Sequence, residues 1–405
     1  MAELRTAYPE WLRLTSITVL GIASYGAYLG LPIILGSLAK SGVLTEADLG
    51  WLASLELLAM MAGSIFAARM VAWPTNRVVL PGLALAVVAN LLCGFATTEF
   101  WLFVLRALAG FGSGICFAIA IARLAAFGDP TKNSGWFTAG VTLGGSLYLV
   151  LLPIADSHFG LAGVFGVLGA CLVVAALFAP FFPQALPEAE AEAASPAAHA
   201  GGAWLGWLLM LSVLVYNAGA TSFWAYAERL GDWAHVPLEQ TSAALSVANL
   251  VSAGVCVGSL WIGRRWGLIK PQIICLLISA VVFATWTAHE GVIGYWARTL
   301  LYYEALTVAN VLQLSLIAAV DRSGRLGALV PAAQGLGQAL GPAGGAFFLT
   351  FGMGYQPKLI GEGVSMALTA VIVFAVFLLI KRAGETEAVK PQDASPRDAG
   401  DAVSP

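Results

Sequence analysis

The sequence is dominated by apolar stretches that are long enough to cross a lipid bilayer as helices. About 20 apolar residues span the hydrocarbon core, where a helix satisfies its own backbone amides. Only 11% of the residues are charged, against about 25% in soluble domains, which excludes a water-soluble fold. Roughly twelve such stretches follow one another: 12–38, 47–68, 78–97, 99–124, 134–155, 161–182, 203–228, 239–262, 270–288, 292–319, 325–350 and 360–381. We therefore expect an all-α membrane protein with twelve transmembrane helices.

Matching landmarks recur in the two halves of the chain. Arg106 stands twenty-three residues before Asp129, at the far end of an apolar run. Arg298 has the same spacing from Asp321. Repeated halves of like topology are typical of secondary transporters. The repeat therefore predicts two six-helix bundles of related structure.

The boundary between the halves is a segment with too little apolar content to fold. Residues 183–202 are rich in Pro, Ala, Glu and Gly, which is typical of a linker. Residues 382–405 are rich in Asp, Pro, Ser and Ala, and we expect a disordered cytoplasmic tail there. The N-terminal six-helix bundle would then occupy residues 1–182 and the C-terminal bundle residues 203–381, with a cytoplasmic linker between them.

Basic residues are distributed unequally between the two sides of the predicted membrane. One side carries Arg5, Arg13, Arg69, Arg77, Arg123, Lys132, Arg264, Arg265, Lys270, Arg322, Arg325, Lys381, Arg382, Lys390 and Arg397. The other side has Lys40, Arg229 and Lys358. The positive-inside rule then places both termini in the cytoplasm. The first apolar run lacks a cleavage site and should remain as a span, so we expect a multi-pass protein of a bacterial-type inner membrane.

Residues suited to catalysis or metal binding are scattered. The five cysteines fall one to a span, and the four histidines lie in predicted loops or at span ends, without metal-ligand or Ser/His spacing. The sequence lacks a Gly-x4-Gly-Lys-Ser/Thr loop for ATP. The formal charge of −3 is too small to indicate a nucleic-acid partner. We expect no enzyme, no metal and no cofactor, but a monomer whose partners are lipid, protons and a small-molecule substrate.

A glycine-rich motif in the fourth predicted span resembles that of a known family. Arg106 is followed at short intervals by Gly110, Gly112 and Gly114. This pattern resembles the Arg/Gly signature in the fourth helix of the major facilitator superfamily. The resemblance implies a transporter whose two bundles alternately expose one central site, with Arg106 as part of the coupling machinery.

Two further stretches carry related motifs. The first follows the eighth span and contains Gly258, Arg264 and Arg265; the second lies in the eleventh span and contains Gly337, Gly341 and Pro342. The first is similar to the family's loop signature, although Gly263 replaces its usual acid. The second resembles the Gly-Pro signature seen in the fifth helix of exporters. Small residues let helices approach closely, and proline permits bends, so we expect both sets, with the glycines of the fourth span, to serve gating or helix packing.

Ionisable residues within the spans are the strongest candidates for function. Glu56, Arg106 and Glu304 each cost roughly 2.5–3.5 kcal/mol at the bilayer centre unless paired or neutral. A carboxyl group in low dielectric favours its neutral form and can carry a proton. We hypothesise that Glu304, with Glu56 second, is the protonation site. The alternatives are a structural hydrogen bond for Glu304 and hydration near the interface for Glu56.

Aromatic and amide side chains are frequent in the helices that should face the central cavity. The candidates for substrate binding are Tyr25, Tyr28, Tyr216, Asn217, Phe223, Asn249, Tyr302, Tyr303, Asn310 and Gln313. They suit an amphiphilic or aromatic organic solute held by stacking and a few hydrogen bonds. The Gly-Pro run favours export, whereas Arg106 and Arg298 would equally serve uptake of an organic anion. A membrane-embedded sensor or enzyme without transport is the alternative of another class.

Overall fold

The computed structural model describes residues 8–124, 127–184, 203–320 and 325–389, which form helices and contain no strand. The first half forms α1 (Glu10–Leu29), α2 (Leu31–Ser41), α3 (Glu46–Ala68), α4 (Thr75–Cys93), α5 (Glu99–Arg123), α6 (Pro130–Leu177) and the short 3-10 helix η2 (Ala179–Phe181). The second half forms α8 (Ala203–Trp233), α9 (Leu238–Trp266), α10 (Ile269–Ala284), α11 (Gly291–Val320), α12 (Arg325–Thr350) and α13 (Tyr355–Val389). The expected all-α class is confirmed.

Length and composition identify most of these helices as membrane spans. Eight helices of the described chain are long and apolar enough to cross a bilayer, and α1 with α2, bent by 46°, makes a ninth candidate. Within α6, Gly160 has a left-handed φ of 58°, so the helix changes direction where the fifth and sixth spans were expected to meet. Helix α10 has only 16 residues. The count of twelve spans therefore stays a prediction.

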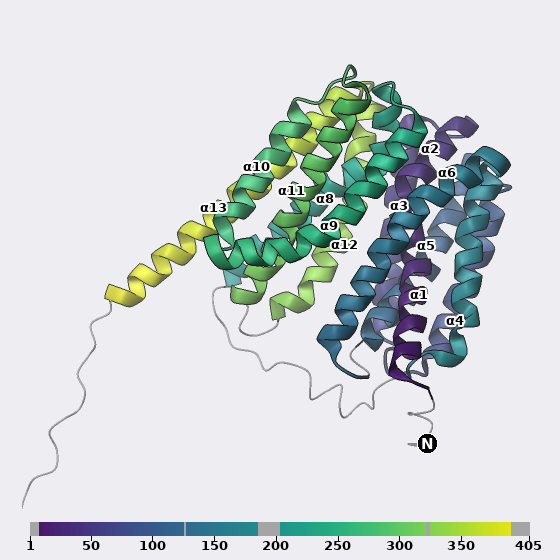
Figure 1. The fold of residues 1–405 in the computed structure, drawn as a ribbon, viewed down its shortest axis with the longest axis horizontal. Coiled ribbons are helices and arrows are strands. Elements are labelled where there is room, and N and C mark those ends of the chain that lie inside the picture. The colour runs from purple at the N-terminus through teal and green to yellow at the C-terminus, as the bar shows by residue number, and fades with distance from the viewer. Residues whose placement is uncertain (1–7, 125–126, 185–202, 321–324, 390–405) are drawn as a thin grey trace, which may run out of the picture.

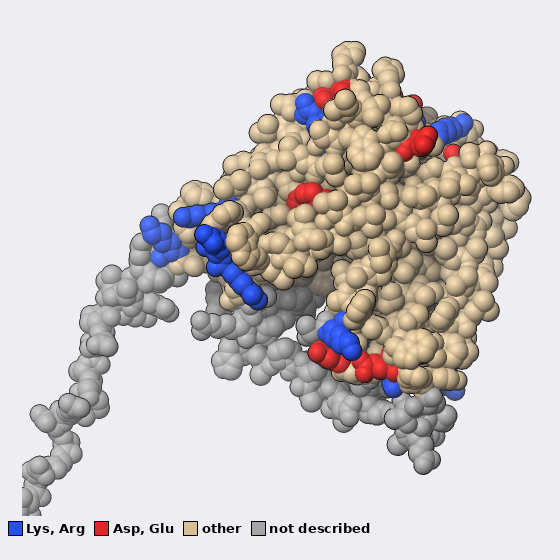
Figure 2. All heavy atoms as spheres, in the orientation of Figure 1, with Lys and Arg blue, Asp and Glu red and all other residues tan. Residues whose placement is uncertain are grey.

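The helices lie in two groups that follow the chain (Figure 1). The first group, α1 to α6, is purple to blue, and the second group, α8 to α13, is green to yellow. Most charged side chains on the face shown in Figure 2 gather at the two ends of the molecule, and its middle is tan apart from one acidic group. This distribution fits a protein whose middle is surrounded by lipid. Most of the predicted linker and the tail beyond residue 389 lie outside the described residues.

Glycines allow α3 and α5 to pack with their backbones in contact. A methyl group added at Gly110 would meet the Glu56 carbonyl oxygen, and one added at Gly114 would meet that of Met60. On the other face of α5, Gly112 lies against the Gly82 carbonyl oxygen of α4. In the second group, Gly337 and Gly341 similarly face the backbone of α8. Close approach of this kind is the usual way that helices associate in lipid.

Not every glycine of the predicted motifs makes such a contact. Around Gly258, no described heavy atom lies within 4 Å of an added Cβ atom. The neighbouring Arg264 and Arg265 are exposed, and the Arg265 guanidinium lies 5.6 Å from the centroid of the Trp261 ring. Pro342 lies inside α12. The gating role of these residues is therefore a proposal.

The two kinds of glycine predict substitution effects of opposite sign. We expect Gly114→Ala to destabilise the protein by about 1–3 kcal/mol, because the new methyl group forces α3 and α5 apart. Gly258→Ala should be neutral or stabilising by up to about 1 kcal/mol, because it lowers the backbone entropy of the unfolded chain without a clash. Unfolding of both variants in detergent micelles measures the difference. Equal destabilisation by both would contradict the proposed packing.

Candidate functional site

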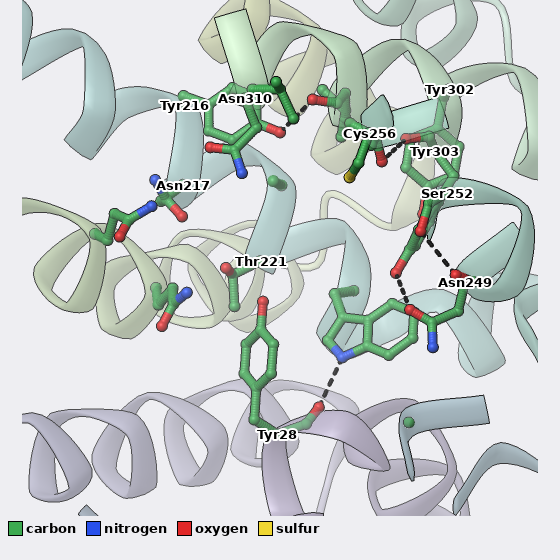
Figure 3. Close-up of a pocket in the computed structure, with 18 of the residues that line it drawn as sticks. Tyr28, Tyr216, Asn217, Thr221, Asn249, Ser252, Cys256, Tyr302, Tyr303 and Asn310 are labelled. Atoms are coloured by element: carbon green, nitrogen blue, oxygen red, sulfur yellow. Dashed lines mark hydrogen bonds between the residues drawn. The ribbon is translucent and has the colours of Figure 1, made fainter. Parts of the chain in front are cut away.

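A cavity of about 310 Å³ lies between the two helix groups (Figure 3). The second group supplies most of its lining from α8, α9, α11 and α12, and the first group contributes Tyr28 and Leu29 of α1 with Gly145 of α6. The polar and aromatic lining residues are Tyr28, Tyr216, Asn217, Thr221, Trp224, Asn249, Ser252, Cys256, Tyr302, Tyr303, Thr307, Asn310, Gln334 and Gln338. The volume is at the lower end of the range of about 300–1,000 Å³ found for small-molecule sites.

Hydrogen bonds from the cavity wall connect the two groups. The Asn249 side-chain amide of α9 donates to the Thr142 carbonyl oxygen at 2.8 Å and to the Ser146 hydroxyl at 3.1 Å, both in α6. Its carbonyl oxygen accepts from the Tyr303 hydroxyl of α11 at 3.2 Å. Trp224 of α8 donates to the Tyr28 carbonyl oxygen at 2.8 Å. Figure 3 draws the bond between Tyr303 and Asn249 and the bond to the Tyr28 carbonyl oxygen.

Seven of the ten predicted substrate-binding residues line this cavity: Tyr28, Tyr216, Asn217, Asn249, Tyr302, Tyr303 and Asn310. The other three are absent from its lining. Tyr25 stacks on Phe117 with ring centroids 4.4 Å apart, and Phe223 packs on Tyr302 at 4.1 Å. Gln313 donates to the Ser212 hydroxyl at 2.9 Å. Phe223 therefore packs against a lining residue, whereas Gln313 contacts Ser212, which does not line the cavity.

The sequence analysis did not select several lining residues, including Thr221, Ser252, Cys256, Gln334 and Gln338. Two of them could have been predicted from their spacing in the sequence. Gln334 and Gln338 stand one helical turn apart in an otherwise apolar, glycine-rich span, and amides at that spacing share one helix face. The small hydroxyl and thiol residues had no such signal, because Ser, Thr and Cys are common packing residues in membrane helices.

Glu56 and Arg106 form a buried ion pair inside the first group. Both Arg106 Nε and Nη2 donate to the Glu56 carboxylate, and Nη1 donates to the Asn90 side-chain oxygen at 2.8 Å. The guanidinium also lies over the Phe165 ring, 5.3 Å from its centroid. Arg106 is 0% exposed. The pair joins α3, α4, α5 and α6, and neither residue lines the cavity.

Glu304 lies in the middle of α11, directly after the cavity-lining Tyr303. Within the part of the chain that the structure describes, both of its buried carboxyl oxygens lack a hydrogen-bond partner. Glu304 itself is not among the described residues that line the cavity. A buried carboxylate without partners is costly, so this position favours a neutral carboxyl group or one that exchanges a proton.

A second buried ion pair, between Lys358 and Glu362 of α13, was not found from the sequence. Lys358 was counted among the basic residues of the outer side, but its side chain is buried and pairs with Glu362 one turn later. The Ser222 hydroxyl donates to Glu362 at 2.7 Å, and the Lys358 ammonium lies 4.6 Å from the Tyr226 ring centroid. The spacing of four residues between these opposite charges could have indicated the pair, because residues four apart are neighbours on a helix. A buried lysine does not report on topology.

Polar contacts between the groups concentrate at the end of the molecule where α3 begins, here called the Glu46 end. The Glu46 carboxylate accepts from Arg229 of α8 at 2.9 Å and from the Tyr355 hydroxyl of α13 at 2.5 Å. Its backbone carbonyl accepts from the Tyr226 hydroxyl at 3.1 Å. Lys40 of α2 lies 3.9 Å from Glu228 of α8. These contacts hold the first and second groups together at this end.

Arg298 does not line the cavity and is bonded to neighbouring residues instead. Its Nε lies 2.8 Å from the Glu290 carboxylate, and its Nη1 donates to the Thr285 hydroxyl at 2.8 Å. All three residues lie at the ends of α10 and α11 on the same side of the molecule. The Arg298 guanidinium is therefore already occupied by protein groups.

A cavity between two groups of membrane-spanning helices is the arrangement typical of a secondary transporter. The family model of the Major Facilitator Superfamily matches residues 14–318. The chain belongs to this superfamily.

Solved structures give the same fold. The nucleoside transporter NupG has a TM-score of 0.70 and 14% identity, over 91% of this chain and 99% of that chain. A bacterial homolog of the human lysosomal transporter Spinster, in an inward-facing and unoccupied conformation, has a TM-score of 0.72 and 15% identity, over 95% of this chain and 100% of that chain. A search of curated protein sequences found no match. At these identities the likeness concerns the fold.

Proposed function

We propose that the protein is a proton-coupled secondary transporter that moves a small organic solute across a bacterial-type inner membrane. The solute would bind in the cavity between the helix groups, and the groups would tilt to expose it to each side in turn. Membership of the superfamily supports transport, and the position of the cavity between two separately packed groups supports alternating access. We also propose that it acts as a monomer with both termini in the cytoplasm.

The contacts at the Glu46 end support a conformation that is closed on one side. With the predicted orientation, this end faces the outside, and the cavity would communicate with the cytoplasm. The structural likeness to an inward-facing Spinster homolog is consistent with that assignment. Binding of solute or proton would then have to shift the equilibrium toward separation of Glu46 from Arg229 and Tyr355.

The proposal of proton coupling rests on the surroundings of Glu304. Among the described residues, no group donates a hydrogen bond to its buried carboxyl oxygens, so a proton would stabilise it in this conformation. The Glu56 carboxyl group, in contrast, already accepts hydrogen bonds from two donors of Arg106. We therefore propose Glu304 as the proton carrier, and we propose that Glu56 and Arg106 keep the first group rigid while it tilts.

For the direction of transport we propose export. The Gly-Pro run supports it, because this run resembles a signature of exporters, and its Gly337 and Gly341 pack α12 directly against α8. Uptake of an organic anion stays the alternative. Measurements should therefore be made in both directions. Since a similarly folded protein is a nucleoside transporter, nucleosides belong in the first panel of solutes together with sugars, phenolic acids, dipeptides and cationic dyes.

Replacing Glu304 by glutamine tests this function. A panel compound that stabilises the purified protein against heat is selected first, because a ligand of the native state raises its stability. In proteoliposomes with a pH-sensitive dye inside, we expect the wild type to move protons with that compound and Glu304→Gln to lose this movement by at least about tenfold. Exchange of labelled for unlabelled compound should persist in the variant, since it needs no net proton movement.

The exposed Glu99 at the start of α5 provides the matched control. Glu99→Gln should leave both proton movement and exchange unchanged. Unaltered proton coupling in Glu304→Gln would reject the proton-carrier assignment, and a wild type that moves no compound of the panel would reject transport of such solutes.

A further inference from the structure

We infer that the cavity accepts an electrically neutral solute that has a flat ring and an edge with both hydrogen-bond donors and acceptors. The inference rests on the proposed function and specifies its substrate class. Cyclic amides and aromatic carboxamides are simple members of this class. Organic anions and cations are excluded from it.

The first argument is the chemistry of the lining. Among the described residues that line the cavity there is no Asp, Glu, Lys, Arg or His. An ionised solute that leaves water loses several kcal/mol or more of hydration free energy unless an opposite charge or several hydrogen bonds replace it. The lining offers neutral amides, hydroxyls and a thiol instead. A neutral polar solute avoids most of this cost.

The second argument is that the cationic side chains within the helices already have partners. Arg106 is paired with Glu56 and Asn90, and Arg298 with Glu290. Lys358 is paired with Glu362. An organic acid in the cavity would have to break one of these pairs to obtain a countercharge, leaving a buried carboxylate behind. This arrangement disfavours the uptake of organic anions that Arg106 and Arg298 suggested in the sequence.

The third argument concerns the shape of the site. Tyr28, Trp224, Tyr302 and Tyr303 supply aromatic surface from α1, α8 and α11. Ring faces of this kind bind flat, weakly polar molecules well. The view in Figure 3 shows Tyr28 pointing across the cavity toward Thr221, between the first and second groups. A ring inserted there would contact both groups at once.

The fourth argument is the number of amide groups around these rings. Asn217, Asn310, Gln334 and Gln338 each combine a donor and an acceptor. The buried side-chain oxygen of Asn310 has no hydrogen-bond partner among the described residues. Such an acceptor is costly unless a ligand or water donates to it. A carboxamide or cyclic amide supplies the missing N–H, whereas a carboxylate cannot.

Pairs of compounds that differ mainly in charge test the inference. Nicotinamide is compared with nicotinate, uridine with uridine 5′-monophosphate, and benzamide with the cation benzamidine. We expect at least one neutral member to raise the melting temperature of the purified protein at millimolar concentration and to bind at least about tenfold more tightly than its charged partner, which corresponds to about 1.4 kcal/mol. Uptake of the same compounds into proteoliposomes is measured in parallel.

Substitutions at Asn310 locate the effect in the cavity. Asn310→Leu should weaken binding of the neutral compound about tenfold, because the amide partner is lost. Asn310→Asp should raise the affinity for benzamidine relative to benzamide, because it adds a charge without changing the shape. Ser315→Ala is the control on the same helix, since the Ser315 hydroxyl bonds the helix's own Val311 carbonyl at 2.8 Å.

The outcomes separate this inference from the function on which it rests. Tighter binding of the charged members, or no binding of any neutral compound, overturns the substrate class. If the proteoliposomes transported only the charged compounds, the proposed transport function would be supported and the inferred substrate class would be wrong. A protein that binds the neutral compounds but moves none of them would instead reject the transport function while retaining the site.

Discussion

Replacing Arg106 by methionine should lower the free energy of unfolding by about 3–5 kcal/mol, the largest stability effect we expect for one substitution. The Glu56 carboxylate would lose two of its donors and remain buried without a countercharge. The Asn90 side-chain oxygen would lose its donor as well. Unfolding of the variant in detergent micelles measures the effect.

Arg298→Met is the control, because this arginine occupies the corresponding place in the second half. Its side chain is 25% exposed beside Glu290, where solvent weakens the ion pair and we expect at most about 1 kcal/mol. The double variant Glu56→Gln with Arg106→Met should recover part of the lost stability, because no buried charge is left unpaired. Similar losses from Arg106→Met and Arg298→Met would show that burial of the first pair is not decisive.

Replacing Glu46 by alanine should open the cavity toward the Glu46 end. The substitution removes a carboxylate bound by Arg229 and Tyr355 across the two helix groups. Loss of such charge-assisted contacts costs about 1.5–3 kcal/mol, which shifts the equilibrium between closed and open forms roughly 10–100-fold. The native Cys256 thiol lines the cavity and can report the change.

The measurement uses a chain in which Cys256 is the single cysteine, reconstituted with known orientation. We expect a membrane-impermeant maleimide added at the Glu46 side to react at least about tenfold faster with Glu46→Ala than with the parent. Glu239→Ala is the control, because Glu239 is exposed at the start of α9 and no ion pair involves it in the described chain. An unchanged labelling rate in Glu46→Ala would mean that other contacts keep this end closed.

Much of the fold was predictable because lipid permits few solutions for an apolar chain. Long apolar runs predicted helices, and the repeat predicted two groups of them. The bend between α1 and α2 at Gly30 was not predicted, because the apolar run continues through it without a break in composition. Residues 161–182 and 134–155 were expected as separate spans, and the structure separates them only by the non-helical Gly160.

The candidate site was predictable where residue type alone restricts position. Tyrosine and asparagine side chains carry polar groups that need partners inside the membrane, so Tyr28, Asn249 and Asn310 were expected at a cavity, and they line one. Their role in binding stays a prediction. Pairing was harder to predict. The sequence presented Glu56 and Arg106 as separate candidates fifty residues apart, and only tertiary packing brings them together. Lys358 was counted only as a topology signal, because neither its burial nor its pairing with Glu362 can be seen from a charge near a span end.

Asn249 gives the cavity a direct influence on the contact between the two groups. Its amide joins α9 to Thr142 and Ser146 of α6, and its carbonyl accepts from Tyr303. A solute that accepted from this amide would take the place of the bonds to α6. The bound solute and the α6 helix would then compete for the Asn249 amide. Binding of the solute would therefore weaken a hydrogen bond between the two groups that has to break before the protein exposes its cavity to the other side.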